Sequence, residues 1–205
     1  GVEFLGLQGY FGGLQRTPDY NERTRLQDEC TAPLVKISTN LEKINLPPKI
    51  VTGGGTGTYA IDSLGNVFTE NQAGTYVFMD VNYMNTNFQQ AIPDPFEVAL
   101  FVRTTVISDS NPEYLVTDAG IKEFGREFLA PQIISGSLSG AKYDLIGDDL
   151  GRVETVDIKN RPSLGDSFEC VTPHCYATLN LFSVYHCVRG NELVDIWIID
   201  AREQC

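Results

Sequence analysis

Glycine and threonine dominate residues 53–58, which directly follow the β-branched run from Lys49 to Thr52. A glycine run at the end of a strand lets the backbone turn several N–H groups toward one place, with no Cβ in the way. An anion such as a phosphate is the usual occupant of such a turn. Thr56 and Thr58 offer additional hydroxyl donors. The alternative is a tight turn without a ligand, since glycine-rich turns are common.

The spacing of this turn fits neither of two common nucleotide-binding motifs. Thr58 stands where the dinucleotide-binding pattern GxGxxG requires its third glycine, and the turn lacks the lysine of a P-loop. A second turn, Ala73 to Thr75, also offers backbone donors. Because the carboxyl ends of parallel strands meet at the mouth of a barrel, two such turns on consecutive strands favour the phosphate interpretation.

Residues 1–92 have the pattern of an α/β unit. Val2–Leu7, Lys49–Thr52 and Thr75–Val81 are short runs that predict strands. Asn21–Asn45 carries apolar residues three or four positions apart, as in a helix, and we expect the main helix to begin at Pro33. The order strand, helix, strand, with glycines after the strands, is typical of a parallel α/β sheet or barrel.

Residues 93–205 predict a different architecture. Pro93 and Pro95 interrupt the pattern, and the residues beyond them form strand-length runs separated by turn signals such as Arg189–Asn191. We therefore expect an antiparallel β domain after a boundary at residues 92–93. Alternation along the last run predicts that Trp197 packs into the core of that domain.

Composition argues against several classes of partner and location. The formal net charge of −12 disfavours nucleic acid and anionic membranes as main partners. No apolar run reaches the roughly 18 residues that a membrane helix needs. The five cysteines have the spacing of neither a disulfide framework nor a CxxC zinc site, so we expect a reducing compartment, the cytoplasm.

The first residues, GVEFLGLQGYFG, have no initiator Met and no charged-then-apolar leader. They have the character of a buried strand that runs into a glycine turn. Because chain termini usually lie at the surface, we expect this sequence to be the C-terminal part of something longer.

Five segments occur in the order found in one enzyme family: IVTGGGTGTYAID, NQAGTYVFMD, DAGIKEFGREF, GRVE and PHCYATLNL…VDIWIIDAR. The sequence resembles the C-terminal half of D-threonine aldolase and D-serine dehydratase-like enzymes. These are relatives of the alanine racemases that use pyridoxal 5′-phosphate (PLP). The resemblance covers nearly all 205 residues. It implies the end of a PLP-binding TIM barrel followed by an antiparallel β domain, working as a homodimer.

The resemblance also implies where the cofactor binds. The side chains of Gln8 and Tyr10 would line the pocket near the cofactor ring. The residues implied for the 5′-phosphate are Gly54, Gly55, Thr56, Gly57, Gly74 and Thr75. Such enzymes hold PLP as a Schiff base with a lysine on the first barrel strand. None of the lysines at positions 36, 43, 49, 122, 142 and 159 has the matching context, so the N-terminal barrel half is expected to supply it.

The activity implied by the resemblance is that of a PLP-dependent lyase acting on a D-β-hydroxy-α-amino acid. The D-threonine aldolase type, which releases glycine and an aldehyde, is slightly preferred because QAGTYVFMD and TLNL are closer to that branch. A D-serine dehydratase-like ammonia-lyase is the close alternative. A non-catalytic relative that binds PLP or another phosphate, and more weakly an amino-acid racemase, are the others.

Members of this family usually bind a divalent metal (zinc, manganese or magnesium) beside PLP, through a His and an Asp or Cys two residues on. In the matching segment, PHCYATLNL, His174 is in place but Tyr176 stands at the second position. On a strand, residues i and i+2 share one face, so Cys175 would point the other way. The second ligand therefore stays open between Cys175 and Tyr176, and the alternative is that His174 is a buried, hydrogen-bonded histidine.

Overall fold

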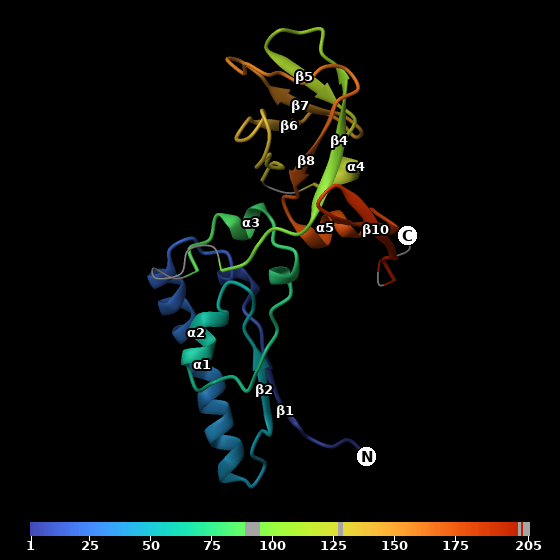
Figure 1. Cartoon of the computed structure of the whole chain (residues 1–205). Coiled ribbons are helices and arrows are strands. Elements are labelled where there is room, and N and C mark those ends of the chain that lie inside the picture. The colour runs from blue at the N-terminus through green and yellow to red at the C-terminus, as the bar shows by residue number, and fades with distance from the viewer. Residues whose placement is uncertain (89–94, 127–128, 201, 203–205) are drawn as a thin grey trace. The chain divides into compact units, whose positions relative to one another are not determined.

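The structure, a computed structural model, describes residues 1–88, 95–126, 129–200 and 202. The chain divides into two compact units, Gly1–Glu97 and Val98–Cys205 (Figure 1). The boundary expected at residues 92–93 lies outside the described residues. Among the described helices, none is both long enough and apolar enough to cross a membrane.

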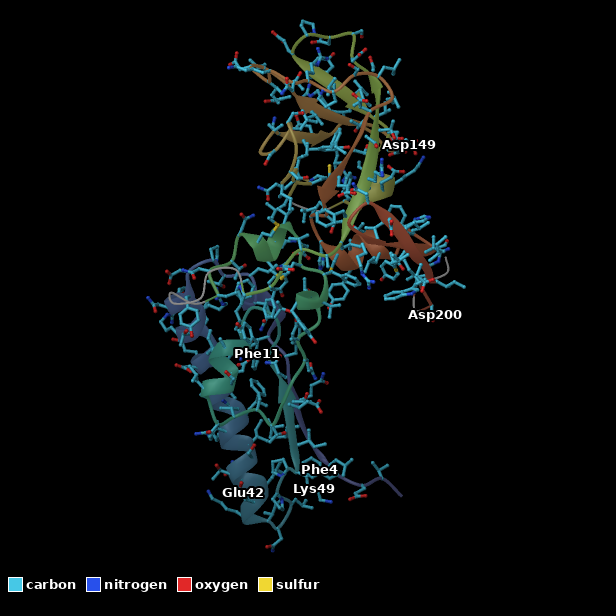
Figure 2. All side chains as sticks on the ribbon, viewed as in Figure 1. Phe4, Phe11, Glu42, Lys49, Asp149 and Asp200 are labelled. Atoms are coloured by element: carbon cyan, nitrogen blue, oxygen red, sulfur yellow. The ribbon has the colours of Figure 1, made fainter. Side chains whose placement is uncertain are left out.

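A three-stranded parallel sheet organises the first unit. Its strands, in spatial order, are β1 (Gly6–Gly9), β2 (Ile50–Gly53) and β3 (Glu70–Asn71). The helical segments are η1 (Gly12–Leu14), α1 (Tyr20–Lys43), α2 (Tyr59–Leu64), η2 (Thr75–Val77) and α3 (Val81–Met84). Gly9 pairs with Gly53, and Gly53 pairs with Asn71, so all three strands end at the same edge. In Figure 2, Phe11 lies just beyond this edge and Lys49 lies at the opposite end of the unit.

The long helix α1 runs through the proline at which it was expected to begin. The Asp19 side chain caps its first turn by accepting a hydrogen bond from the Glu22 N–H at 2.8 Å. Pro33 lies inside the helix, so the carbonyl of Glu29 has no N–H to accept from in the next turn. Both residues are exposed, which lets water take the place of the missing donor. The prediction that the main helix starts at Pro33 is therefore wrong.

The strand predicted over Thr75–Val81 is also wrong. The 3₁₀ turn η2 and the helix α3 occupy this segment, and Met79 between them has a left-handed backbone with φ 55°. The Asp80 side chain caps α3 by accepting from the Tyr83 N–H at 3.0 Å. An apolar run that contains a capping aspartate thus ends as two short helical turns, because the cap satisfies backbone donors that a strand would have left to a neighbour. The third parallel strand is β3, which precedes the second turn.

The second unit is an antiparallel β domain, as predicted, so the expected fold class of an α/β part followed by an all-β part is confirmed. Five strands form one sheet in the order β6 (Tyr143–Leu145), β7 (Gly151–Glu154), β5 (Tyr114–Thr117), β4 (Phe101–Ser108) and β8 (Ser167–Val171). Two short helices, α4 (Ile121–Phe124) and α5 (Cys175–Leu179), accompany it. The core of this unit includes Leu115, Phe124, Tyr143, Val153 and Cys170, all fully buried.

Strands β9 (Val184–Arg189) and β10 (Glu192–Ile198) form a separate two-stranded sheet. Every residue of β10 is exposed, and Trp197 is 60% exposed, with its indole Nε1–H donating to Asp195 at 2.8 Å. The prediction that Trp197 packs into the core is therefore wrong. Alternation along a strand indicates two faces, but it does not indicate whether either face meets another layer of structure.

Arg23 ties three separate segments of the first unit together. This arginine on α1 is fully buried, and its Nε donates to the Gly57 carbonyl at 2.7 Å. Its Nη1 and Nη2 donate to the carbonyls of Thr17 and Asn87. Burial lowers the pKa of the guanidinium, which nonetheless stays charged because arginine begins from a very high value. Arg23 is thus a buried cation whose hydrogen bonds go to backbone oxygens.

Replacing this arginine should destabilise the protein. Arg23→Leu removes every donor to the three carbonyls, and we expect it to lower the free energy of unfolding by about 2–4 kcal/mol. Arg16→Leu is the matched control, because Arg16 is exposed and should change stability by less than about 0.5 kcal/mol. Urea denaturation of the purified variants measures both values. Equal stability of the two variants would show that Arg23 does not hold these segments.

Candidate functional site

The parallel strands carry a row of polar side chains on one face. The register places Gln8, Thr52 and Glu70 side by side. The Thr52 hydroxyl donates to Glu70 at 2.8 Å, and the Gln72 amide donates to Thr52 at 3.0 Å. The Gln8 amide in turn lies 3.4 Å from the Gln72 oxygen, to which it donates. Gln8 therefore stands in a connected polar row next to the edge where the strands end.

The glycine turn after β2 is shaped by contacts that leave no room for a side chain. Gly54 has φ +65°, and a Cβ there would lie 2.1 Å from the Asp62 carboxylate. A Cβ on Gly57 would lie 1.7 Å from the carbonyl oxygen of Gln15. The run of glycines is therefore required by the close approach of the backbone to its neighbours.

Two of the amides predicted to bind an anion are used inside the protein. The Gly55 N–H donates to the Thr58 hydroxyl at 3.1 Å, and the Gly57 N–H donates to the Gln15 side-chain oxygen at 3.1 Å. The N–H groups of Gly54 and Thr56 make no hydrogen bond to any residue that the structure describes. These two amides are the donors in this turn that remain for a ligand.

The second turn lies directly beside the first. The Tyr76 N–H donates to the Thr56 hydroxyl at 3.1 Å, which joins the two turns. The N–H groups of Gly74 and Thr75 also make no hydrogen bond within the described part of the chain. Thr56 is 2% exposed and Thr75 is 3% exposed. Buried backbone donors nearly always have an acceptor, so this junction is suited to an anion with several oxygens, such as a phosphate.

Tyr10 lies at the open side of the glycine turn. Half of its surface is exposed, and its ring is close enough that a Cβ on Gly55 would lie 3.3 Å from the Tyr10 Cε2 atom. The same ring contacts the Gly12 position at 3.1 Å. The structure thus brings Tyr10 next to the turn, whereas Gln8 is one strand position further back.

Sequence reasoning missed the polar side chains that support the turn from behind. Gln15, Gln27 and Asp62 are all buried and belong to no motif. Burial raises the pKa of Asp62, and hydrogen bonds to its carboxylate from Thr58, Gln27 and Asn71 act in the opposite direction. A signal was present in the sequence only as an aspartate within the otherwise apolar start of a helix.

A hollow of about 520 Å³ lies beside α2 and β3. Its lining includes the rings of Tyr59, Phe68, Tyr76 and Phe96, together with Asp62 and Asn71. None of the residues predicted to bind the cofactor lines it. The Phe96 ring contacts both Tyr59 and Tyr76, with centroids 5.1 and 5.6 Å apart, so this hollow is an aromatic cleft separate from the junction of the two turns.

The residues predicted to hold a metal do not lie on a strand. Strand β8 ends at Val171, and His174 is the N-cap residue of helix α5. Cys175 is 1% exposed, whereas Tyr176 is 57% exposed and its ring packs edge-on against the His174 imidazole with centroids 5.4 Å apart. The argument that residues 174 and 176 share a strand face is therefore wrong, because a helix begins between them.

These residues fit a divalent metal poorly. A tyrosine hydroxyl keeps its proton at neutral pH, and the Cys175 side chain belongs to the buried interior. Within the residues that the structure describes, no three His, Cys, Asp or Glu side chains come together as a metal site would require.

Comparisons with known proteins agree on one group of enzymes. A family model described as a putative serine dehydratase domain matches residues 99–188. D-threonine aldolase from Arthrobacter sp is 34% identical over 202 residues, which are 98% of this chain and 52% of that protein. 3-Hydroxy-D-aspartate aldolase from Paracoccus denitrificans (strain Pd 1222) is 31% identical over 204 residues, again 98% and 52%. The chain resembles the C-terminal half of D-threonine aldolase-like enzymes.

The fold agrees with this resemblance. The crystal structure of D-threonine aldolase from Filomicrobium marinum superposes with a TM-score of 0.89 at 30% identity, over 97% of this chain and 53% of that chain. This D-threonine aldolase-like chain therefore spans about half the length of the curated relatives it matches. The end of a parallel α/β layer followed by an antiparallel β domain is the arrangement shared with the solved structure.

The close approach at Gly57 gives a direct test of the turn. Gly57→Ala places a methyl group against the Gln15 carbonyl, and we expect it to lower the free energy of unfolding by about 1–3 kcal/mol. Gly65→Ala is the control, because a Cβ there meets only ordinary contacts at 3.6 Å. Chemical denaturation compares the two. A Gly57→Ala variant as stable as Gly65→Ala would mean that the turn has more space than the structure gives it.

Proposed function

We propose that the protein is a PLP-dependent lyase of the aldolase type that acts on D-β-hydroxy-α-amino acids. The observation that carries this proposal is the junction of the two turns, where the Tyr76 N–H binds the Thr56 hydroxyl and leaves buried amides without an acceptor. The names of the two curated relatives, a D-threonine aldolase and a 3-hydroxy-D-aspartate aldolase, support the choice of substrate class.

The residues at the junction fit the phosphate of PLP. The amides of Gly54, Thr56, Gly74 and Thr75 would donate to its oxygens, because they have no hydrogen-bond partner among the described residues. Tyr10 would bound the ring of the cofactor on the open side of the turn, and Gln8 would contribute from the polar row of the sheet. Gly55 and Gly57 would shape the turn, since their own N–H groups already bind Thr58 and Gln15. When bound, PLP supplies the electron sink for cleavage next to the α-carbon.

The proposal assigns the remaining parts of the enzyme to chain beyond this segment. The lysine that binds PLP would come from an N-terminal barrel half. Lys122, which lies in a segment shared with the family, is exposed and paired with Asp149 at 2.9 Å, which gives it no role at the cofactor. A homodimer in the cytoplasm completes the proposal.

The full-length enzyme separates the proposed activity from its alternatives. With D-threonine we expect glycine and acetaldehyde in equal amounts, and with L-threonine no product. Pyruvate and ammonia from D-serine would instead favour the dehydratase, which the matched serine dehydratase domain also supports. No product from any of these substrates, together with no visible absorbance of a bound cofactor, would leave a non-catalytic relative.

The poor fit of residues 174–176 to a metal predicts insensitivity to chelation. We expect prolonged dialysis against EDTA to change the initial rate with D-threonine by less than about twofold, because the Tyr176 hydroxyl and the buried Cys175 are unsuited to complete a site with His174. Atomic absorption of the dialysed protein checks that no zinc, manganese or magnesium remains. A loss of activity that returns when one of these ions is added would contradict the prediction and place a metal in the site.

A further inference from the structure

The glycine turn is supported by a buried hydrogen-bond network that ends on a single carboxylate. We propose that Thr58 and Asp62 are positioning residues that hold this turn in its anion-binding shape. The proposal deepens the proposed function and rests on it, because it explains how one turn keeps two amides for a ligand while it uses two others internally. Neither residue contacts the position assigned to the phosphate through its own side chain.

The Thr58 hydroxyl uses its full hydrogen-bonding capacity. It accepts from the Gly55 N–H and from the Gln15 side-chain amide, both at 3.1 Å. It donates to the Asp62 Oδ2 atom at 2.6 Å. A hydroxyl has one proton and two lone pairs, so these three bonds saturate it. The position of Gly55 is therefore fixed by an atom that has no other arrangement available.

The Asp62 carboxylate gives every bond in the network its direction. Besides Thr58, it accepts from the Gln27 amide at 2.5 Å and from the Asn71 amide at 3.1 Å. A carboxylate only accepts, so the Thr58 proton must point toward Asp62 and both lone pairs of Thr58 must face Gly55 and Gln15. An asparagine at position 62 would set an N–H₂ group against at least one of these donors. The carboxylate thus selects one conformation of the turn.

The network joins the turn to two elements that do not move with it. Gln27 lies on α1, and Asn71 ends β3. Asp62 itself is 8% exposed and forms no ion pair with a described residue. The nearest charged or titratable groups on the surrounding elements have other partners or face the hollow: Arg23 binds carbonyls, Glu70 binds Thr52, and Tyr59 lines the hollow. The hold on the turn is therefore made by neutral donors converging on one buried anion.

Binding of the cofactor by variants of the full-length enzyme tests the proposal. For Thr58→Val, which keeps the shape and loses the hydroxyl, we expect the Kd of the apoenzyme for PLP to rise about tenfold or more. At saturating PLP, kcat should stay within about threefold, because the hydroxyl does not touch the reacting atoms. Thr58→Ser, which keeps the hydroxyl, should restore the Kd. Thr86→Val is the matched control, since Thr86 is equally buried and bonds only within its own turn.

Hydrogen exchange of the apoenzyme gives a second readout that needs no cofactor. We expect the amides of Gly55 and Gly57 to be protected in the wild type and in Thr58→Ser, and to exchange rapidly in Thr58→Val and in Asp62→Asn. Asp62→Asn provides the same test if the valine variant does not fold.

The two readouts separate the possible failures. Unchanged PLP affinity and unchanged exchange in Thr58→Val would overturn the positioning role while leaving the lyase proposal intact. A wild-type enzyme that does not bind PLP, but whose exchange pattern follows the variants as expected, would overturn the lyase proposal and support the positioning role. A loss of affinity in Thr86→Val equal to that in Thr58→Val would also overturn it, because the effect would then be a general consequence of losing a buried hydroxyl.

Discussion

The site depends on how closely the backbone of residues 53–57 approaches the segment that precedes α1. At Gly57 the Gln15 carbonyl occupies the space of a side chain, and the carboxylate of Asp62 does the same at Gly54. This approach makes the Gln15 side chain available to one amide of the turn and the Arg23 guanidinium available to one of its carbonyls. Glycine at these positions therefore serves two ends, since it admits the neighbours and lets the turn expose other amides.

Much of this arrangement could be predicted from short-range patterns. The glycine run after a β-branched strand, the helix that follows β1 and the change to antiparallel strands after Pro95 all appear in local sequence. Each depends on propensities within a few residues. The same patterns failed where a distant or capping interaction decides the outcome. Asp80 turns an apolar run into α3, and water on the exposed side of α1 permits Pro33.

The supporting network could not be predicted because its members come from four separate segments. Gln15, Gln27, Asp62 and Asn71 are common residue types with no characteristic spacing, and only the folded sheet brings them together. The segment around His174 failed for a related reason. The family pattern assumes a strand at residues 174–176, whereas the chain begins helix α5 there. Trp197 shows that alternation alone does not establish burial.

Two buried charges of opposite sign lie on either side of the glycine turn, and together they explain how an acidic protein can hold an anion there. A lone carboxylate behind the turn would repel a phosphate, since the interior screens charge weakly. Arg23 donates directly to the Gly57 carbonyl and brings a positive charge to the same few residues. Asp62 fixes the geometry through Thr58, while Arg23 offsets its field. Because neither charge forms an ion pair with a described residue, both act on the turn through its backbone and not on each other. The turn therefore gains a single conformation without becoming repulsive to its ligand.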